Sequence, residues 1–217
     1  MTKTSKSLST VVSSMKIVKA DEEGVKEAAA TMLAGGVAVY PTETFYGLGC
    51  LPSDPDAAMR VCKIKGRADK ALPLICGSTE AARRVVEFNA AAELLAERFW
   101  PGPLTLVLPS RVSYPMWVTH GKKTLAVRVS SNETARRLAS MSAGVIVSTS
   151  ANKSGEEPPM TAKEAAKQIG REVDIVVDGG TTPGGRPSTI LDLTSDELWI
   201  LRSGPVTGVE IKEALRG

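Results

Sequence analysis

The sequence predicts a single α/β domain built on a mixed β-sheet with helices packed against it. The chain has 217 residues, which is enough for one sizeable core and short for two independent domains. Stretches with helical spacing of apolar residues alternate with short apolar runs typical of buried strands. Near the C-terminus, several strand-like runs follow one another without a helix between them. Because parallel neighbours need a long crossover, we expect a mixed sheet.

The first half of the chain contains helices whose starts are marked by capping residues. Asp21 can cap a helix with apolar positions at 25–33, and a Gly-Gly pair follows it. Ser53 or Asp54, followed by Pro55, predicts the start of the next helix. The other elements expected in this half are strands at 37–40 and 72–76 and helices at 79–87 and 90–99.

The second half contains three capping boxes, in which a Ser or Thr precedes a Glu by three residues. They are Ser130 with Glu133, Thr161 with Glu164, and Thr207 with Glu210. Each box predicts the start of a helix. The strand-like runs of this half lie at 104–108, 124–129, 145–148, 173–177, 188–193 and 197–202.

Composition excludes a membrane-spanning protein and points to a local anion site. The chain is 42% hydrophobic and 24% charged, and no apolar run reaches the roughly 18 to 20 residues of a spanning helix. The formal charge is +3, but the first 20 residues hold four of the 27 basic residues and none of the 24 acidic ones. The remainder is nearly neutral, so a protein-wide nucleic-acid surface is not indicated.

Cysteine and histidine usage points to a cytoplasmic protein without a metal cluster. Three cysteines, an odd number without Cys-x-x-Cys spacing, suggest reduced thiols. Any His-Cys metal site or Ser-His-Asp triad would depend on the single histidine, His120, for which a surface loop position is favoured. Residues 1–15 are rich in Ser, Thr and Lys and lack a secretory apolar core. We expect them to form a disordered extension before a domain at 16–217, with a transit peptide as the alternative.

Three cations at alternate positions form the first candidate site. They are Lys63, Lys65 and Arg67, separated by Ile64 and Gly66. An extended backbone would point all three the same way, toward an oligophosphate or the phosphates of RNA. The alternative is a solvated helix end, whose Lys and Arg complement the negative end of the helix dipole.

Two loops rich in hydroxyl groups form the second and third candidates. Thr42, Glu43 and Thr44 follow the strand expected at 37–40, and the run STSANKSG at 148–155 follows another expected strand. Loops that leave strand ends are where α/β sheets build ligand sites, and small side chains let backbone amides reach a ligand. Ordinary turns, in which these side chains bind the local backbone, are the alternative.

Isolated arginines and tryptophans add to these candidates. Arg128, Arg186 and Arg202 lie near expected strand ends, where each could bind an anion or join a surface ion pair. The three tryptophans could stack on bases, but core or cleft-wall positions are favoured. They are Trp100, Trp117 and Trp199.

The joint occurrence of seven strings resembles the YrdC/TsaC family, the threonylcarbamoyl-AMP synthases, in their short single-domain form. In chain order they are YPTETxYGLG at 40–49, KGR at 65–67, WPGPLT at 100–105, AVRV at 126–129, STSANxSG at 148–155, PSTI at 187–190 and RxG at 202–204. Each string alone is common, but their number and order are specific. The resemblance covers the chain from about residue 16 onward and implies a twisted mixed sheet around a basic concave cleft.

The resemblance implies an enzyme, a nucleotidyltransferase that converts L-threonine, bicarbonate or CO2, and ATP into L-threonylcarbamoyladenylate and pyrophosphate. The product would feed the N6-threonylcarbamoyladenosine modification at position 37 of tRNAs reading ANN codons, through a downstream tRNA threonylcarbamoyl transferase machinery. Mg2+ is implied as the partner of ATP, without metal ligands from protein side chains. Weak direct tRNA binding and no membrane association are also expected.

The resemblance also implies roles for particular residues. Lys65 and Arg67 match the catalytic, phosphate-binding Lys-x-Arg of the family. Thr42, Arg128 and Ser150 match substrate-binding positions, and the guanidinium of Arg128 can pair with the carboxylate of threonine. The positions that match the nucleotide pocket are Lys65, Arg67, Thr124, Ser148, Ser150, Asn152, Ser188 and Arg202.

Two other functions remain open at this point. One is a noncatalytic RNA-binding protein that uses the same basic cleft. The other is a divergent paralogue with the same fold and another nucleotide-linked activity. The intact Ser-Ala-Asn run, with Thr42 and Arg128, favours the synthase, because plain phosphate binding needs only cations and amides.

Overall fold

The computed structural model describes residues 15–66, 70–195 and 197–216. Apart from Met15, the extension expected at 1–15 lies outside the described residues, and so does Arg67. Within the described ranges the predicted α/β class with mixed strand pairing is confirmed, and the strands divide between two sheets.

The first sheet has five strands in the order β1-β9-β2-β3-β8. Their bounds, in that order, are Lys16–Lys19, Ile175–Asp178, Ala38–Pro41, Tyr46–Gly49 and Thr149–Ser150. β9 runs parallel to β1 and β2, whereas β3 runs antiparallel to β2 and β8. β2 and β3 therefore form a hairpin whose connecting residues, 42–45, carry the hydroxyl and carboxylate groups singled out above.

The second sheet has six strands in the order β11-β10-β5-β6-β4-β7. Their bounds, in that order, are Trp199–Arg202, Thr189–Asp192, Leu104–Pro109, Thr124–Arg128, Leu74–Cys76 and Val145–Val147. β6 runs antiparallel to β5 and parallel to β4. Consequently Arg128, at the carboxyl end of β6, lies beside Ile75, whereas Thr124 lies at the other end beside Pro109.

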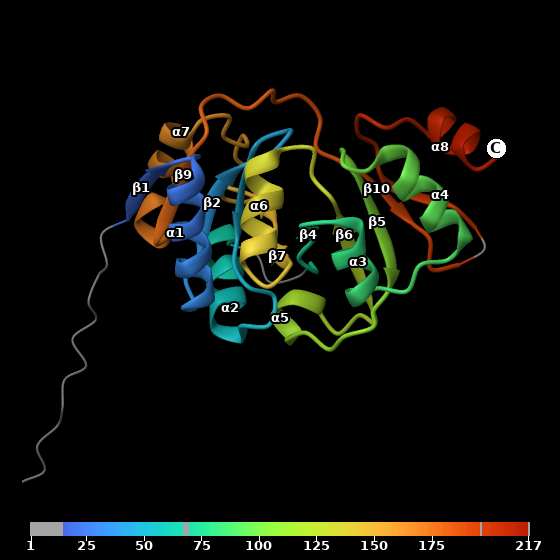
Figure 1. The fold of residues 1–217 in the computed structure, drawn as a ribbon, viewed down its shortest axis with the longest axis horizontal. Coiled ribbons are helices and arrows are strands. Elements are labelled where there is room, and N and C mark those ends of the chain that lie inside the picture. The colour runs from blue at the N-terminus through green and yellow to red at the C-terminus, as the bar shows by residue number, and fades with distance from the viewer. Residues whose placement is uncertain (1–14, 67–69, 196, 217) are drawn as a thin grey trace, which may run out of the picture.

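Helices cover the sheets and supply most of the outer surface (Figure 1). Their bounds are Glu22–Leu33 (α1), Pro55–Lys65 (α2), Thr79–Val85 (α3), Ala90–Phe99 (α4), Met116–Thr119 (α5), Glu133–Met141 (α6), Ala162–Ile169 (α7) and Gly208–Ala214 (α8), with a 3-10 turn at Gly170–Glu172. α1 and α6 pack side by side, and α4 contacts α8 near the carboxyl end of the chain. No helix in the described part of the chain is long and apolar enough to cross a membrane.

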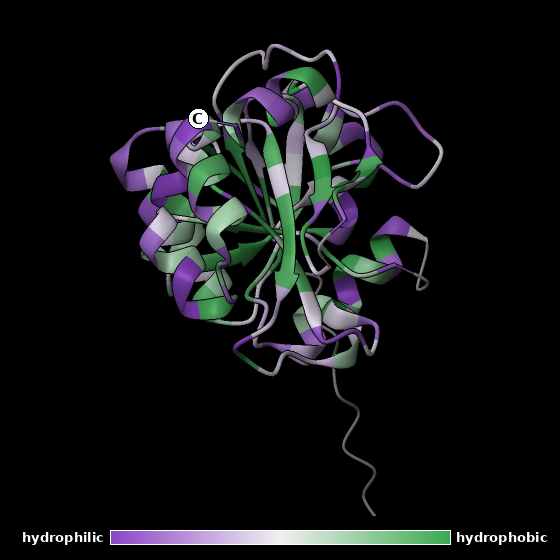
Figure 2. Ribbon diagram, turned by 90° about the vertical axis from the view of Figure 1, so that its right-hand side faces the viewer, coloured by the Kyte–Doolittle hydropathy of each residue, from purple (hydrophilic) through white to green (hydrophobic). Residues whose placement is uncertain are grey.

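The apolar core follows the strands, which run through the middle of the molecule in Figure 2. A second apolar cluster lies between α1, α6 and the strands beneath them, and includes Val25, Met32, Leu138 and Ile146. These four side chains are fully or almost fully buried. Burial of each such side chain contributes roughly 1.5–3 kcal/mol, which fixes α6 against α1 and against strands β2, β4 and β7 of both sheets.

Most of the predicted helix starts are confirmed. The side chain of Asp21 accepts a hydrogen bond from the Gly24 amide, and Asp54 caps α2 with Pro55 at its first turn. Both later capping boxes form, with reciprocal contacts between side chain and backbone. They are Thr161 with Glu164 and Thr207 with Glu210.

The capping box expected at Ser130 and Glu133 is wrong. α6 is capped by Asn132, whose side-chain oxygen accepts from the amide of Ala135 at 3.2 Å. Asn and Ser are about equally good caps, so the box pattern alone could not choose between them. The Ser130 hydroxyl instead donates to the carboxylate of Glu43.

Elements with weak patterns were missed. The run at 46–49 is strand β3 and not part of a loop. The sequence did not predict this strand, because Gly47 and Gly49 are atypical of strand interiors. A Cβ at Gly49 would lie 1.9 Å from the carbonyl oxygen of Val147, so the close approach of the chains there requires glycine. β1, β8 and the single-turn α5 were also not predicted.

Two predictions about aromatic residues have different outcomes. Trp100 is buried and donates from Nε1 to the Leu104 carbonyl, as expected of a core residue. Trp199 is 58% exposed on β11, so the expectation of a core or cleft-wall position is wrong for it.

His120, expected on the surface, is half-buried where α5 ends, in a left-handed backbone conformation.

Candidate active site

A cavity of about 530 Å³ lies where the two sheets meet. Its walls come from the β2–β3 hairpin and β8 of the first sheet, and from β4, β5, β6, β10 and β11 of the second. This volume is in the range of small-molecule sites. The fold therefore brings motifs that are far apart in the sequence to one place.

The structure places most of the sequence-predicted site residues in the lining of this cavity. They are Thr42, Lys65, Arg128, Ser148, Ser150, Asn152, Ser188 and Arg202. Thr124 is not brought to it, because it begins β6 while Arg128, four residues later, ends that strand at the cavity. Four residues of strand span about 13 Å, which separates the two side chains. Arg67 lies outside the described residues.

Lys65 is the most enclosed cation of the cavity. It is the last residue of α2, only 3% exposed, and the helix ends at Gly66 with a φ of 63°. The extended backbone expected for this cation motif is therefore wrong. The helix instead leaves Lys63 exposed and turns Lys65 inward. The alternative interpretation of this motif, a solvated helix end, is therefore correct for Lys63 but wrong for Lys65.

The ammonium of Lys65 is bonded to the loop at 148–155. Nζ lies 2.6 Å from the Ser150 carbonyl and 3.2 Å from its Oγ, and 2.6 Å from the Asn152 carbonyl and 3.0 Å from its Oδ1. Ser154 donates its amide to the Lys65 carbonyl at 3.0 Å. An ammonium has three protons, and in the loop at 148–155 alone four oxygens lie within hydrogen-bond distance of it. A ligand anion could therefore take the place of the most distant partner, the Ser150 hydroxyl.

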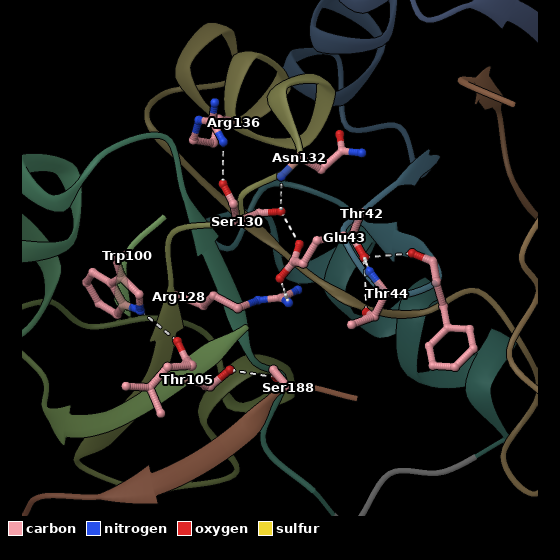
Figure 3. Close-up of polar contacts among 12 residues, drawn as sticks. Thr42, Glu43, Thr44, Trp100, Thr105, Arg128, Ser130, Asn132, Arg136 and Ser188 are labelled. Atoms are coloured by element: carbon pink, nitrogen blue, oxygen red, sulfur yellow. Dashed lines mark hydrogen bonds and ion pairs between the residues drawn. The ribbon is translucent and has the colours of Figure 1, made fainter. Parts of the chain in front are cut away.

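Arg128, which also lines the cavity, forms a buried ion pair with Glu43 (Figure 3). Its Nη1 contacts Oε1 of Glu43, and both side chains are only 10% exposed. The other carboxylate oxygen of Glu43 accepts from the Ser130 hydroxyl. Arg128 presents five N–H donors in total, so the ion pair leaves others for a ligand carboxylate. Sequence reasoning noted the carboxylate of Glu43 but not its partner, because 85 residues separate the two.

The hairpin hydroxyls are held by their own turn. Thr42 donates from Oγ1 to the Phe45 carbonyl at 2.7 Å, and its Oγ1 lies 3.3 Å from that of Thr44. The turn interpretation of this motif is thus confirmed, and Thr42 still lines the cavity. The backbone amide of Thr44 also donates to Thr42 Oγ1 at 3.3 Å, so a ligand donor at this hydroxyl would replace one of the two long contacts with Thr44.

Hydroxyl and guanidinium groups from β5, β10 and β11 form the third wall. Ser188 Oγ lies 2.9 Å from Thr105 Oγ1. Arg202 donates from Nε to the Ser188 carbonyl and from Nη2 to its Oγ, each at 2.9 Å. These contacts fix the guanidinium of Arg202, which lines the cavity together with exposed Leu201.

Tyr40, in β2, is fully buried and packs against Gly47 of β3. Its hydroxyl donates to the Val147 carbonyl at 3.0 Å, and burial raises the pKa of this phenol far above its ordinary value. Gly47 lies over the ring, and a Cβ there would be 3.1 Å from Tyr40 Cε2 and 3.3 Å from Ser148 Oγ. A side chain at position 47 would therefore require these neighbours to shift by a few tenths of an ångström.

The charge of the cavity is one-sided although the protein body is nearly neutral. Its lining contains Lys65, Lys70, Arg128 and Arg202 and, among the described residues, no Asp or Glu. Lys70 was not predicted, since nothing in its sequence context distinguishes it from a surface lysine. In the described part of the chain, no group of three or more His, Cys, Asp or Glu side chains could hold a metal ion. The lining is suited to phosphate and carboxylate groups.

Fold and site together define an α/β domain whose two mixed sheets enclose a cationic cavity for a small anionic ligand. The chain belongs to the Sua5/YciO/YrdC family, whose model, described as telomere recombination, matches residues 30–204. The family resemblance inferred from the seven strings is thereby confirmed.

Relatives and solved structures support this membership. A threonylcarbamoyl-AMP synthase of Pyrococcus abyssi is 38% identical over 197 residues, which cover 90% of this chain and 58% of that protein. A threonylcarbamoyl-AMP synthase of Halorhodospira halophila is 40% identical over 170 residues, covering 77% and 89%. The crystal structure of Pyrococcus abyssi Sua5 complexed with L-threonine aligns with a TM-score of 0.86 at 37% identity, covering 92% and 59%. The chain thus spans less than two thirds of the Pyrococcus protein.

Proposed function

We propose that this chain is an L-threonylcarbamoyladenylate synthase, which joins L-threonine, bicarbonate or CO2, and ATP. The observation that supports this most strongly is the origin of the cavity lining, which comes from the strings that resemble the synthase family. The names of the relatives agree, and one structure with the same fold is a threonine complex. A lining of cations, hydroxyls and amides also fits a reaction that needs no covalent nucleophile.

Threonine is proposed to lie between the hairpin and β6. The guanidinium of Arg128 would pair with the threonine carboxylate through the donors that Glu43 leaves open. Thr42, whose own proton goes to Phe45, would accept from the ammonium or hydroxyl of threonine. Ser150, at the border of the two subsites, could contact either substrate.

ATP is proposed to lie along Lys65, the loop at 148–155 and Arg202. A phosphate oxygen would replace the Ser150 hydroxyl at Lys65 Nζ, the longest of the four contacts there. Ser148, Asn152 and Ser188 offer hydroxyl and amide groups along the same wall. Mg2+ is proposed to enter bound to the phosphates of ATP, since the described lining offers no carboxylate ligand and Mg2+ commonly binds through substrate phosphates.

The proposed reaction has two bond-forming steps. The amine of threonine adds to CO2 and loses a proton, which gives N-carboxythreonine. A carboxylate oxygen of this carbamate then attacks the α-phosphorus of ATP, and the bond to the β-phosphate oxygen breaks to release pyrophosphate. The protein contributes positioning and charge neutralisation, which are the main sources of rate in phosphoryl and nucleotidyl transfer.

The product is a mixed anhydride, which must pass to an acceptor. We propose that a tRNA threonylcarbamoyl transferase in the cytoplasm consumes it, placing the group on N6 of the adenosine at position 37 of tRNAs that read ANN codons. The nearly neutral body favours small-molecule chemistry over a noncatalytic role in RNA binding.

A direct assay tests the proposal. Purified protein would be incubated with Mg-ATP, bicarbonate, and threonine, serine or valine in turn, while pyrophosphate and the adenylate are followed. Valine lacks the hydroxyl of threonine at nearly the same shape, and serine lacks only the methyl group, so the panel measures selectivity. Product that requires both threonine and bicarbonate supports the synthase. No product, with retained RNA or nucleotide binding, would favour the RNA-binding protein or the divergent paralogue.

A further inference from the structure

We infer that Glu43 is a positioning residue, which holds the guanidinium of Arg128 in the orientation that receives the substrate carboxylate. The part of this inference that concerns threonine rests on the proposed function above. Glu43 itself is absent from the described cavity lining, whereas Arg128 is part of it. Glu43 is therefore placed to act on a ligand through Arg128.

Both carboxylate oxygens of Glu43 are already used. Oε1 contacts Nη1 of Arg128 and Oε2 accepts from the Ser130 hydroxyl. With each oxygen bound to a different side chain and the side chain 10% exposed, Glu43 is placed to hold Arg128 and Ser130 and is not itself presented to the cavity. The carboxylate is a bridge between Arg128 and the start of α6.

The bridge is anchored at its far end (Figure 3). Ser130 Oγ accepts from the amide of Asn132 at 3.2 Å, and the Ser130 carbonyl accepts from Nη1 of Arg136 at 2.7 Å. Ser130 is fully buried, and α6 is fixed by its packing on α1. The position of the Glu43 carboxylate is thus set by a helix start, and Glu43 passes that constraint to Arg128.

Such a bridge has a physical purpose. A long Arg side chain otherwise samples many rotamers, and this cavity also attracts phosphates, which would compete for a mobile guanidinium. Glu43 neutralises part of the charge of Arg128 and fixes one edge of its guanidinium. The remaining edge is then directed at a single carboxylate, which separates the threonine subsite from the phosphate subsite around Lys65.

A double-mutant cycle tests the inference. We expect Glu43→Gln to lower kcat/KM for threonine about tenfold to a hundredfold, with the KM for ATP unchanged within about twofold. In the Arg128→Ala background, Glu43→Gln should lower kcat/KM for threonine by less than about threefold, because the guanidinium that Glu43 positions is absent. Ser130→Ala should produce a smaller change of the same kind. Glu133→Gln makes the same chemical change at an exposed position of the first turn of α6 and should have no effect.

Two results would overturn the inference. One is an equal penalty for Glu43→Gln with and without Arg128, as expected if Glu43 binds the substrate ammonium itself. The other is an unchanged kcat/KM for threonine in a Glu43→Gln protein whose Tm equals that of the wild type. If Glu43→Gln fails to fold, Ser130→Ala replaces it in the double-mutant cycle with Arg128→Ala.

A substrate-free readout keeps this inference separable from the proposed function. The 15N side-chain NMR signal of Arg128 should show restricted guanidinium motion in the wild type, and this restriction should be lost in Glu43→Gln and Ser130→Ala. Unchanged motion would contradict the positioning role whatever reaction the protein catalyses. A wild type without threonine-dependent product, but with the NMR change, would contradict the proposed function alone.

Discussion

Lys65 and Asn152 are joined by two hydrogen bonds across one wall of the cavity, from the ammonium to the Asn152 carbonyl at 2.6 Å and to its Oδ1 at 3.0 Å. Asn152 in turn donates from Nδ2 to the carbonyls of Lys153 and Glu156. One buried cation therefore organises the loop that follows β8. The loop and the cation form a single unit, and substitutions at either should affect both.

Replacing Lys65 by Ala should reduce turnover tenfold to a thousandfold. The change removes a charge near the proposed phosphate subsite and takes the Lys65 donor from the partly buried Ser150 carbonyl and the buried Asn152 carbonyl. Loss of one charge-stabilising contact has this magnitude. Steady-state pyrophosphate release measures the effect. Lys63→Ala, on the exposed side of the same helix, is the matched control and should retain wild-type turnover. Near-normal activity of a folded Lys65→Ala protein would refute the role of Lys65.

Binding of tRNA should be weak and sensitive to salt. The cations of the site lie inside a cavity, and the body carries nearly equal numbers of basic and acidic residues, so few phosphates can be neutralised at once. Fluorescence anisotropy with labelled tRNA at 50 and 200 mM salt would show this. Tight binding that persists at the higher salt would contradict it.

Asn132→Ala should destabilise the fold by about 1 kcal/mol, the usual cost of losing a helix cap. For a chain of this size that corresponds to a fall of roughly 2–4 °C in Tm, measurable by calorimetry. Glu133→Ala, which the wrong capping box would have made equally costly, should change Tm little. A larger fall in Tm for Glu133→Ala than for Asn132→Ala would contradict Asn132 as the cap and support a capping box of Ser130 with Glu133.

Stability should fall at alkaline pH because two thiols resist ionisation. Burial raises the pKa of Cys50 and of Cys76 from 9.0 to about 12. Above pH 9 the unfolded chain therefore binds fewer protons than the folded one, so the free energy of unfolding decreases as pH rises. We expect a loss of roughly 1 kcal/mol per thiol by pH 10. Denaturant titrations should show a shallower decline in Cys76→Ala; an identical pH dependence in that variant would contradict the assignment.

The fold class and most helix starts could be predicted from sequence because they depend on local signals. Asp21, Asp54 and the boxes at Thr161 and Thr207 cap their helices through contacts within three residues of each cap. The division into two sheets could not be predicted in this way. Strand pairing such as that of β3 with β8 joins residues about a hundred positions apart, and short strands with glycine carry little pattern.

The same distinction between local signals and long-range contacts holds for the site. Its polar residue types could be read from the strings, but not their partners. Arg128 with Glu43 and Lys65 with Asn152 each join segments more than 80 residues apart. The direction of Lys65 was also beyond reach, because it depends on whether the helix ends before or after that residue. Thr124 shows the converse, since its position in a matching string does not bring it to the cavity.

Incorporation of labelled bicarbonate into a nucleotide product is the sharpest test of the proposed synthase activity. The protein would be given 13C-labelled bicarbonate, threonine and Mg-ATP, and the nucleotide product would be analysed by mass spectrometry together with pyrophosphate. We expect an adenylate that contains threonine and one labelled carbon, formed in an amount equal to the pyrophosphate and abolished when threonine is omitted. Pyrophosphate release without a labelled adenylate, or no reaction at all from folded protein, would contradict it.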